Sequence, residues 1–375
     1  MLRKVAIVTW VKYYNFGTFL QAYALQSIIT KLGYESYILD DTSIREIEQI
    51  GNEQSTLYRM LSYFRKELVM LLNYGVKDYI LFKKSDTMYI QFRNHYLQID
   101  KKINPLSDLD NRYDIFVCGS DQIWYPSVNI YSPYYYLSFT NKKKVAYAPS
   151  IGTVNYPKSF IKNVKPLLDQ FNYLSVREKA GANIINSITS RTVEVVLDPT
   201  LLLNSNEWDN LLLPNPICKG EYIFCYFLTF NERYVRFVMD YSKRMSLPVL
   251  VFALSQNICM KILGDKVIAG GPKEFLTAIK GASYIFTDSF HGTIFAIQFQ
   301  KRFITFKRFK ETDSMNQNSR LDNLFTMLEL NNCFIGEENL SEISSIVDVD
   351  YARVHTILDN ERKKSLSFLQ NALEN

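Results

Sequence analysis

The sequence has few of the residues and patterns that mark a protein class directly. Its 375 residues include 3 Trp, 3 His and 5 Cys, and the cysteines form neither a CxxC pair nor a zinc-binding spacing. An odd number of unpatterned cysteines argues against a disulfide scaffold and fits a reducing compartment. Apolar runs such as 247–254 are shorter than the about 20 residues that span a bilayer, and no signal-peptide cleavage pattern follows the N-terminus. We therefore expect a cytoplasmic protein.

The sequence also lacks a large excess of charge of either sign. The 43 basic and 38 acidic residues are interspersed and give a net charge of +5, so no basic tail is available to nucleic acid. We expect no nucleic-acid partner, whereas a mildly basic surface suits anionic small molecules or the anionic inner face of a membrane. Glycine-rich nucleotide loops, HExxH and GxSxG are absent. Two DxD pairs, at 108–110 and 348–350, are interpreted as solvated turn acids, so nothing requires a metal or a cofactor.

Aromatic residues, by contrast, are abundant, with 26 Tyr and 25 Phe. Some of them lie in loops that follow predicted strands. Many of the others lie in a helical pattern over about 56–97. That segment is either part of the core or an amphipathic surface that meets a membrane or a lipid-linked acceptor.

Short apolar runs alternate with helical patterns along most of the chain, which predicts parallel βαβ units. Two prolines and a glycine over 213–220 indicate a linker. We therefore expect an N-terminal α/β domain over 1–215 with the helical insertion, and a C-terminal α/β domain over 220–350. Two such Rossmann-like domains would face a cleft, a common place for a small-molecule site. A last helix over 351–375 could pack back on the first domain.

Polar residues cluster where predicted strands end, the edge at which open α/β sheets bind ligands. His291 follows the strand over 284–287, opens a helix and is followed by Gly292. Helix N-termini hold anions, and a histidine there can transfer protons near neutral pH. Capping the helix or bonding a buried carbonyl is an equally open role for His291.

Two arginines and one loop are further candidates. Arg177 follows the strand over 173–176 and could clamp a phosphate or carboxylate, or simply pair with Glu178 on the surface. Arg320 opens another helix and could either reach the cleft or be solvated. Aromatic and amide groups after the first strand suit a sugar, although ordinary loop packing explains Tyr13 and Tyr14 as well.

Seven ordered segments together resemble the polysaccharide pyruvyl transferase family over about residues 4–330. They read YYNFGTFLQAYALQ at 13–26, GSDQIW at 119–124, YAPSIG at 147–152, SVRE at 175–178, LDPTLLL at 197–203, TDSFHGTIFAI at 287–297 and SRLDNLF at 319–325. No single segment is decisive, but their order and spacing are specific.

The resemblance implies two Rossmann-like domains similar to GT-B glycosyltransferases. It also implies transfer of pyruvate from phosphoenolpyruvate to a sugar hydroxyl pair of a surface-glycan precursor, with release of phosphate. Some members carry an arginine two residues before the histidine, where this chain has Ser289, so Arg320, Lys307 or Arg308 replaces it or the donor site differs.

The expected site residues fall into three groups. His291 and Asp288 are the expected catalytic pair, in which Asp288, or alternatively Asp121 or Glu178, orients the histidine or deprotonates a hydroxyl. Donor binding is assigned to Arg177, Ser289, Gly292, Thr293 and Arg320, and acceptor binding to Asn15, Tyr14, Asp121, Gln122 and Trp124. The alternatives are a nucleotide-sugar glycosyltransferase of GT-B type and an inactive glycan-binding protein.

Overall fold

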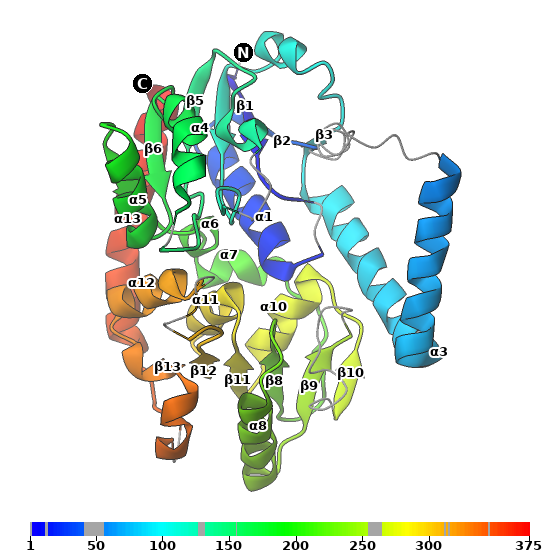
Figure 1. Ribbon diagram of the computed structural model, residues 1–375. Helices are drawn as coiled ribbons and strands as arrows, with labels where there is room; N and C mark the ends of the chain where they lie inside the picture. Colours follow the sequence, from blue (N-terminus) through cyan, green and yellow to red (C-terminus); the bar gives the residue numbers. More distant parts are fainter. Residues whose placement is uncertain are drawn as a thin grey trace.

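The computed structural model contains two parallel β-sheets, one in each half of the chain (Figure 1). It describes residues 2–11, 14–40, 56–126, 132–154, 156–253, 265–310, 313, 316–343 and 346–375. The strand orders are β3-β2-β1-β4-β5-β6-β7 and β10-β9-β8-β11-β12-β13. Each sheet has a central pair of strands, β1 and β4 in the first and β8 and β11 in the second. The strands that follow each of them in sequence are added toward the two edges, as in doubly wound nucleotide-binding folds. The expected pair of Rossmann-like α/β domains is therefore confirmed.

The strands are short and mostly buried, because helices cover both faces of each sheet. The first sheet consists of β1 (Lys4–Val8), β2 (Glu35–Leu39), β3 (Ile99–Asp100), β4 (Ile115–Cys118), β5 (Lys143–Ala146), β6 (Tyr173–Val176) and β7 (Val193–Val195). The second consists of β8 (Ile223–Tyr226), β9 (Val249–Phe252), β10 (Lys266–Ile268), β11 (Tyr284–Thr287), β12 (Arg302–Phe306) and β13 (Phe334–Ile335).

The helices follow the strands as the alternating pattern predicts. In the first half they are α1 (Phe16–Lys31), α3 (Thr56–Tyr96), α4 (Lys158–Leu168), α5 (Lys179–Ile188), α6 (Pro199–Leu202) and α7 (Ser205–Asp209). In the second half they are α8 (Glu232–Met245), α10 (Pro272–Gly281), α11 (Phe290–Gln298), α12 (Ser319–Leu328) and α13 (Tyr351–Glu374). The edge strands β3, β10 and β13 have two or three residues each, too few for an apolar pattern to show.

The two halves share a hydrophobic core where they meet, and residues of both halves line a cavity at the carboxyl ends of the two sheets. At the centre of this core, the Phe16 ring of α1 stacks on Phe275 of α10 with ring centroids 4.4 Å apart, and its edge meets Tyr226 of β8. The buried cluster around these rings draws side chains from both sheets and from α13. Packing between α1, α10 and β8 therefore joins the halves at the centre of their contact.

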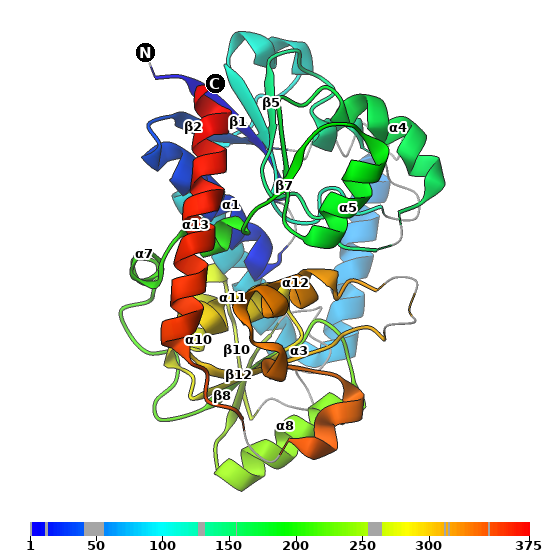
Figure 2. The same ribbon diagram turned by 90° about the vertical axis from the view of Figure 1, so that its left-hand side faces the viewer.

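Two helices cross from one half to the other. In α3, Tyr89 and Phe92 pack in the core around α1, and Ser85 donates to the carbonyl of Ala253 beside β9. The last helix, α13, runs along both halves (Figure 2). Its Ser365 accepts a hydrogen bond from Leu197 N, and its Arg362 donates to the carbonyl of Leu201. The domain boundaries expected from the sequence stay a prediction, and these helices join the halves on either side of them.

Candidate functional site

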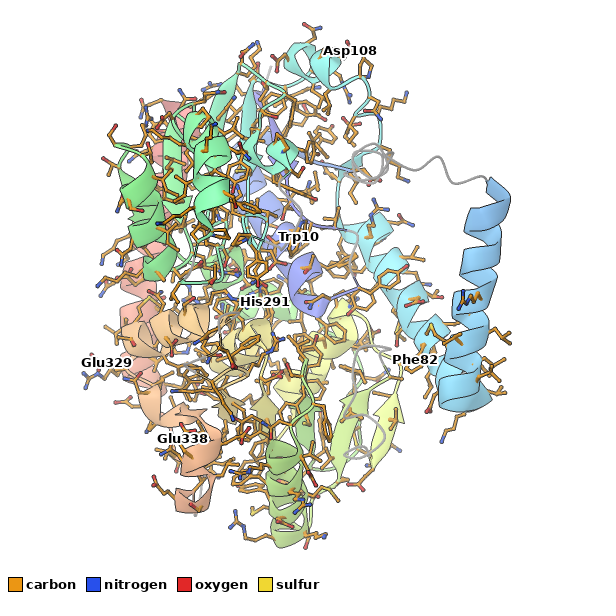
Figure 3. All side chains as sticks on the ribbon, viewed as in Figure 1. Trp10, Phe82, Asp108, His291, Glu329 and Glu338 are labelled. Atoms are coloured by element: carbon orange, nitrogen blue, oxygen red, sulfur yellow. The ribbon has the colours of Figure 1, made fainter. Side chains whose placement is uncertain are left out.

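A cavity of about 180 Å³ lies where the carboxyl ends of the two sheets meet. It sits beyond β1 and β4 in one sheet and β8 and β11 in the other, the points at which both strand orders reverse. Figure 3 places Trp10 and His291 at this junction. The lining is largely polar and comes from both halves: Trp10, Asn15, Thr18, Asp121, Gln122, Leu228, Asp288, Ser289, Phe290, His291, Arg308, Phe309, Gln317, Asn318, Arg320 and Leu321.

Two helix N-termini converge on this cavity. Asn15 caps α1 by accepting from Gly17 N at 2.9 Å, and Ser289 caps α11 by accepting from Gly292 N at 3.3 Å. The His291 ring lies directly against Gly17, since a Cβ there would be 1.9 Å from His291 Nδ1. Only glycine leaves room for this contact. The sequence therefore places two positively polarised helix ends and one imidazole side by side.

Asp198, just after β7, joins the charged groups beneath the cavity. Its Oδ2 lies 2.6 Å from Arg177 Nη1 and 3.6 Å from His291 Nε2, and it accepts from Ser120 Oγ at 3.2 Å. Its Oδ1 accepts from the backbone and the hydroxyl of Thr200. The 3.6 Å separation is too long for a hydrogen bond. It is short enough for an ion pair once the imidazole is protonated.

These contacts keep Asp198 ionised in spite of its surroundings. Burial would raise the pKa of the carboxyl, but the interactions with His291, Arg177 and Thr200 outweigh it and hold the pKa well below its usual range. A fixed negative charge therefore lies between a histidine from one half and an arginine from the other. His291 lines the cavity, whereas Arg177 lies outside the lining and contacts it through the Phe290 ring.

Arg177 and Arg320 are buried with donors to spare. Arg177 Cζ lies 4.4 Å and Arg320 Cζ 5.7 Å from the centroid of the Phe290 ring. Within the described part of the chain, Arg177 Nε and Nη2 and Arg320 Nε have no hydrogen-bond partner. Buried guanidinium donors are rarely left unsatisfied, because losing hydration without a replacement is costly. Their number and position point to an anion as the group that satisfies them.

The charge on Arg320 supports the same conclusion. Burial and repulsion from Arg177 lower the pKa of Arg320 to about 9, and the attraction of Glu178 and Asp121 offsets this only in part. Glu178 itself is engaged elsewhere: its Oε1 accepts from Ser150 Oγ, Ile151 N and Gly152 N and holds that loop in place. Burial and the neighbouring Arg177 thus disfavour the charged form of Arg320. A bound anion would favour it.

Asp288 lines the cavity but is occupied by the backbone. Its Oδ1 accepts from Leu228 N at 2.6 Å and its Oδ2 from Thr229 N at 2.9 Å. Burial raises the pKa of Asp288 to about 6, although Arg308, whose Nε lies 3.8 Å from Oδ2, opposes the rise. In the described residues no hydrogen bond or ion pair links Asp288 to His291. The carboxylate beside the histidine is Asp198, and the catalytic role expected for Asp288 stays a prediction.

Asp121 and Gln122 form the wall from the first half. Asp121 has a positive φ of 62°, which turns the chain after β4, and its Oδ2 accepts from Thr18 Oγ1 at 2.7 Å. Gln122 Nε2 donates to Gln317 Oε1 of the other half at 3.1 Å. Of the three carboxylates proposed to act on a hydroxyl, Asp121 is the one that faces the cavity without being held by two or more backbone amides.

The remaining residues expected at the site differ in whether they reach the cavity. Trp124 is buried, stacks on Tyr136 and donates to the Tyr135 carbonyl, so the structure does not bring it to the cavity. Tyr14 stacks on Tyr89 of α3, outside the lining. Gly292 and Thr293 lie inside α11 and position its first turn. Ser289, where some relatives have arginine, is a helix cap, and both Arg308 and Arg320 line the cavity. Tyr13 lies outside the described residues.

Two important groups were not among the expected site residues. In the sequence, Asp198 appears only within the segment LDPTLLL at 197–203. Its Asp-Pro-Thr pattern indicates a helix cap as readily as a carboxylate that forms buried ion pairs. Gly17 gives no sequence signal of its contact with His291, which lies 274 positions away. Both roles depend on how the two halves meet, which local patterns do not report.

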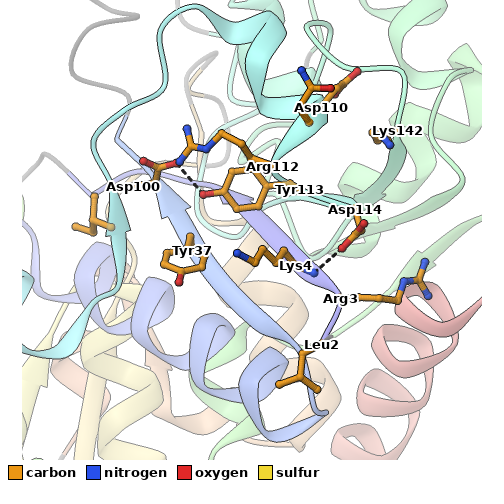
Figure 4. Close-up of a pocket in the computed structure, with 12 residues that line it drawn as sticks. Leu2, Arg3, Lys4, Tyr37, Asp100, Asp110, Arg112, Tyr113, Asp114 and Lys142 are labelled. Atoms are coloured by element: carbon orange, nitrogen blue, oxygen red, sulfur yellow. Dashed lines mark hydrogen bonds and ion pairs between the residues drawn. The ribbon is translucent and has the colours of Figure 1, made fainter.

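A larger cavity, about 940 Å³, lies at the opposite, amino ends of β1, β4 and β5 (Figure 4). Several of its charged groups already have partners. Asp100 accepts from Tyr113 Oη and forms an ion pair with Arg112, and Asp114 accepts from Lys4 N at 2.7 Å. Size therefore does not identify the site here. The smaller cavity lies at the edge where α/β sheets bind ligands and holds the unpaired donors.

The comparisons with known proteins give one family and a set of distant folds. The family model described as polysaccharide pyruvyl transferase matches residues 15–308. No curated protein matches. Similar solved structures include a UDP-GlcNAc 2-epimerase from Neisseria meningitidis bound to UDP-GlcNAc (10% identity, 100% of both chains covered, TM-score 0.47). They also include an alpha-glucosyltransferase in complex with UDP and DNA (9% identity, 98% of this chain and 95% of that chain, TM-score 0.49) and a putative UDP-N-acetylglucosamine 2-epimerase from Listeria monocytogenes (10% identity, 96% and 95%, TM-score 0.44).

Proposed function

Because the chain belongs to the polysaccharide pyruvyl transferase family, we propose that it transfers pyruvate from phosphoenolpyruvate to two hydroxyls of a sugar in a surface-glycan precursor. The products are a pyruvate ketal and inorganic phosphate. The observation that carries the proposal is the pair of buried arginines, Arg177 and Arg320, with unsatisfied donors beside two helix N-termini.

Phosphoenolpyruvate suits this cavity in size and charge. The cavity of about 180 Å³ is smaller than the roughly 300–1,000 Å³ of typical small-molecule pockets. The donor carries a carboxylate and a phosphate, and these are the groups that guanidinium forks and helix N-termini bind best. Arg177 and Arg320 would hold one anionic group each, and the α11 N-terminus would add backbone donors. In this arrangement Arg320 supplies the charge that Ser289 lacks.

The reaction needs two proton movements and no oxidant. One sugar hydroxyl adds to C2 of the enol, and the methylene carbon takes up a proton to become a methyl group. The second hydroxyl then displaces phosphate from C2, and its proton leaves with the phosphate or with a protein base. One sugar diol and one phosphoenolpyruvate thus give one ketal and one phosphate, with no other reactant.

His291 is the group best placed to move these protons. It lines the cavity, its Nε2 has no hydrogen-bond partner in the described structure, and Asp198 lies 3.6 Å from it. A histidine oriented by a buried carboxylate is a common arrangement for acid–base catalysis. Asp121, on the opposite wall, is the carboxylate that would accept a proton from the incoming hydroxyl. Asn15 and Gln122 would orient the sugar.

The acceptor is proposed to be a glycan intermediate, which a lipid carrier could hold at the inner face of the membrane. The direct test is to incubate the protein with isotope-labelled phosphoenolpyruvate and glycan intermediates extracted from the source cells. We expect phosphate release together with a product heavier by one pyruvate less one water. A nucleotide-sugar glycosyltransferase would instead consume a nucleotide sugar, and a glycan-binding protein would turn over neither donor.

Replacing His291 tests its assigned role within the same assay. The His291→Ala variant should lose phosphate release by about 10²–10⁴-fold, the usual contribution of a general acid–base group. His355→Ala is the matched control, because His355 lies on α13 near Gln300, outside the cavity, and should leave turnover unchanged. Near-full activity of His291→Ala would remove the histidine from the mechanism.

A further inference from the structure

The hairpin formed by α3 projects beside the rest of the molecule (Figure 1). Apolar side chains around its turn are exposed. The turn is at Gly75, whose φ of 78° interrupts the helix. Six of the thirteen large apolar side chains exposed in the described structure lie on α3, and Leu72 and Val76, on either side of the turn, are 74% and 64% exposed. The other seven are scattered along the chain. A concentrated exposed apolar patch on a globular protein is usually an interaction surface.

Helical geometry separates this patch from the side of α3 that packs on the core. After the turn, Phe82, Ser85 and Tyr89 are buried, whereas Val76 and Ile80 lie on the opposite face of the helix. Before the turn, Leu68, Val69 and Leu72 share one outward face, and Glu67 faces the second arm, where it accepts from Tyr79 Oη and pairs with Lys83. Among the described side chains of α3, the aromatic Phe82, Tyr89 and Phe92 thus belong to the core, and the exposed large apolar ones are aliphatic.

The charges around the patch favour one kind of partner. Residues 65–84 contain five Lys or Arg and two acidic residues, and Arg65, Lys77 and Lys84 are exposed. Of the acids, Glu67 is already paired with Lys83. Exposed aliphatic side chains bordered by cations are the composition that binds anionic lipid surfaces, because burial of apolar groups and attraction to the headgroups add together. No helix in the described part of the chain is long and apolar enough to cross a membrane.

We propose that the turn of the α3 hairpin, with Leu68, Val69, Leu72, Val76 and Ile80, is a docking surface for an anionic lipid bilayer. The aliphatic side chains enter the interface while Arg65, Lys77 and Lys84 contact the headgroups. The second arm of α3 is fixed by Ser85, which donates to the Ala253 carbonyl and accepts from Gly270 N. Because this arm is fixed to the second half of the chain, docking orients the whole molecule relative to the membrane.

Vesicle co-sedimentation tests the proposal without either substrate, so its outcome is separate from that of the proposed reaction. The wild-type protein should bind vesicles that contain phosphatidylglycerol, bind pure phosphatidylcholine weakly, and dissociate at high salt. The double variant Leu72→Glu/Val76→Glu should lower the partition coefficient at least tenfold. Val347→Glu, a comparably exposed position outside α3, should bind as the wild type does.

Charge and self-association provide the deciding controls. Lys77→Glu/Lys84→Glu should weaken binding to anionic vesicles while leaving weak binding to neutral ones unchanged. Circular dichroism on each variant checks that the fold is kept, as expected for exposed positions. Equal binding of wild type and Leu72→Glu/Val76→Glu to anionic vesicles would overturn the proposal. So would a wild-type dimer in sedimentation equilibrium that the same substitutions convert to monomer, because the patch would then be covered by a second copy.

Discussion

Two buried aspartates, one beneath the cavity and one in its wall, have opposite surroundings. Asp198 lies beside Arg177 and His291, whose charges hold its pKa well below the usual range against the effect of burial. Asp288 has only Arg308 at 3.8 Å as a charged neighbour, is held by the amides of Leu228 and Thr229, and has its pKa raised by burial to about 6.

The two aspartates therefore have different roles. Asp198 is the counter-charge that allows an arginine from one half and a histidine from the other to be buried together. Asp288 fixes the loop after β8, which forms part of the cavity wall. Position after a strand, which both residues share, does not distinguish these roles. What distinguishes them is the charge that the other half of the molecule brings.

The largest expected effect follows from removing the charge of Asp198. Asp198→Asn leaves the buried Arg177 without its counter-charge and removes the carboxylate beside His291, which typically costs about 3–5 kcal/mol of unfolding free energy. Urea denaturation at neutral pH measures this cost. Asp288→Asn should lose only about 1 kcal/mol, the value of one hydrogen bond to the backbone. Equal losses in the two variants would remove the distinction.

A smaller loss of stability is expected from a substitution at the contact between the halves. Gly17→Ala places a Cβ 1.9 Å from His291 Nδ1 and should displace the ring, at about 1–3 kcal/mol for overpacking. Phosphate release should fall as well, since the histidine is moved. In a His291→Ala background the same substitution should cost much less stability. A double-mutant cycle without coupling would show that the two residues do not press on each other.

The smallest expected effect is on the pH dependence of folding stability. The pKa of Asp288 is raised in the folded protein, so the native state binds its proton more tightly than the unfolded chain does. Its contribution to stability is therefore present at acid pH and declines as the pH rises from about 4 through about 6. Asp198, whose pKa is lowered, contributes stability that is lost as the pH falls below its unfolded value near 4. Unfolding curves of Asp288→Asn and Asp198→Asn across this range should differ from wild type in opposite directions.

Much of the fold follows from local patterns in the sequence. The predicted strands over 173–176 and 284–287 are present residue for residue, because apolar runs are local signals. Arg177, Arg320, Asp121 and His291 come together because each follows a strand or opens a helix at the same edge.

Other features depend on packing that a sequence pattern does not report. Trp124 has the residue type of a sugar platform, yet a stacked tyrosine and a backbone carbonyl take both its face and its N–H. The stacking of Phe16 on Phe275, which joins the two halves, depends on residues far apart in the chain. The role of Asp198 depends on two partners that are 21 and 93 positions away in the chain.

Binding of phosphoenolpyruvate to the arginine pair is the most direct test of the account. Titration calorimetry should detect binding to the wild-type protein, and Arg320→Gln should weaken it roughly 10- to 150-fold, the value of about 1.5–3 kcal/mol for a hydrogen bond to a charged group. Arg244→Gln, on α8 where the guanidinium lies over Tyr241, should bind as the wild type does. Wild-type affinity in Arg320→Gln and Arg177→Gln would contradict the account, because the buried donors would then not be the donor site.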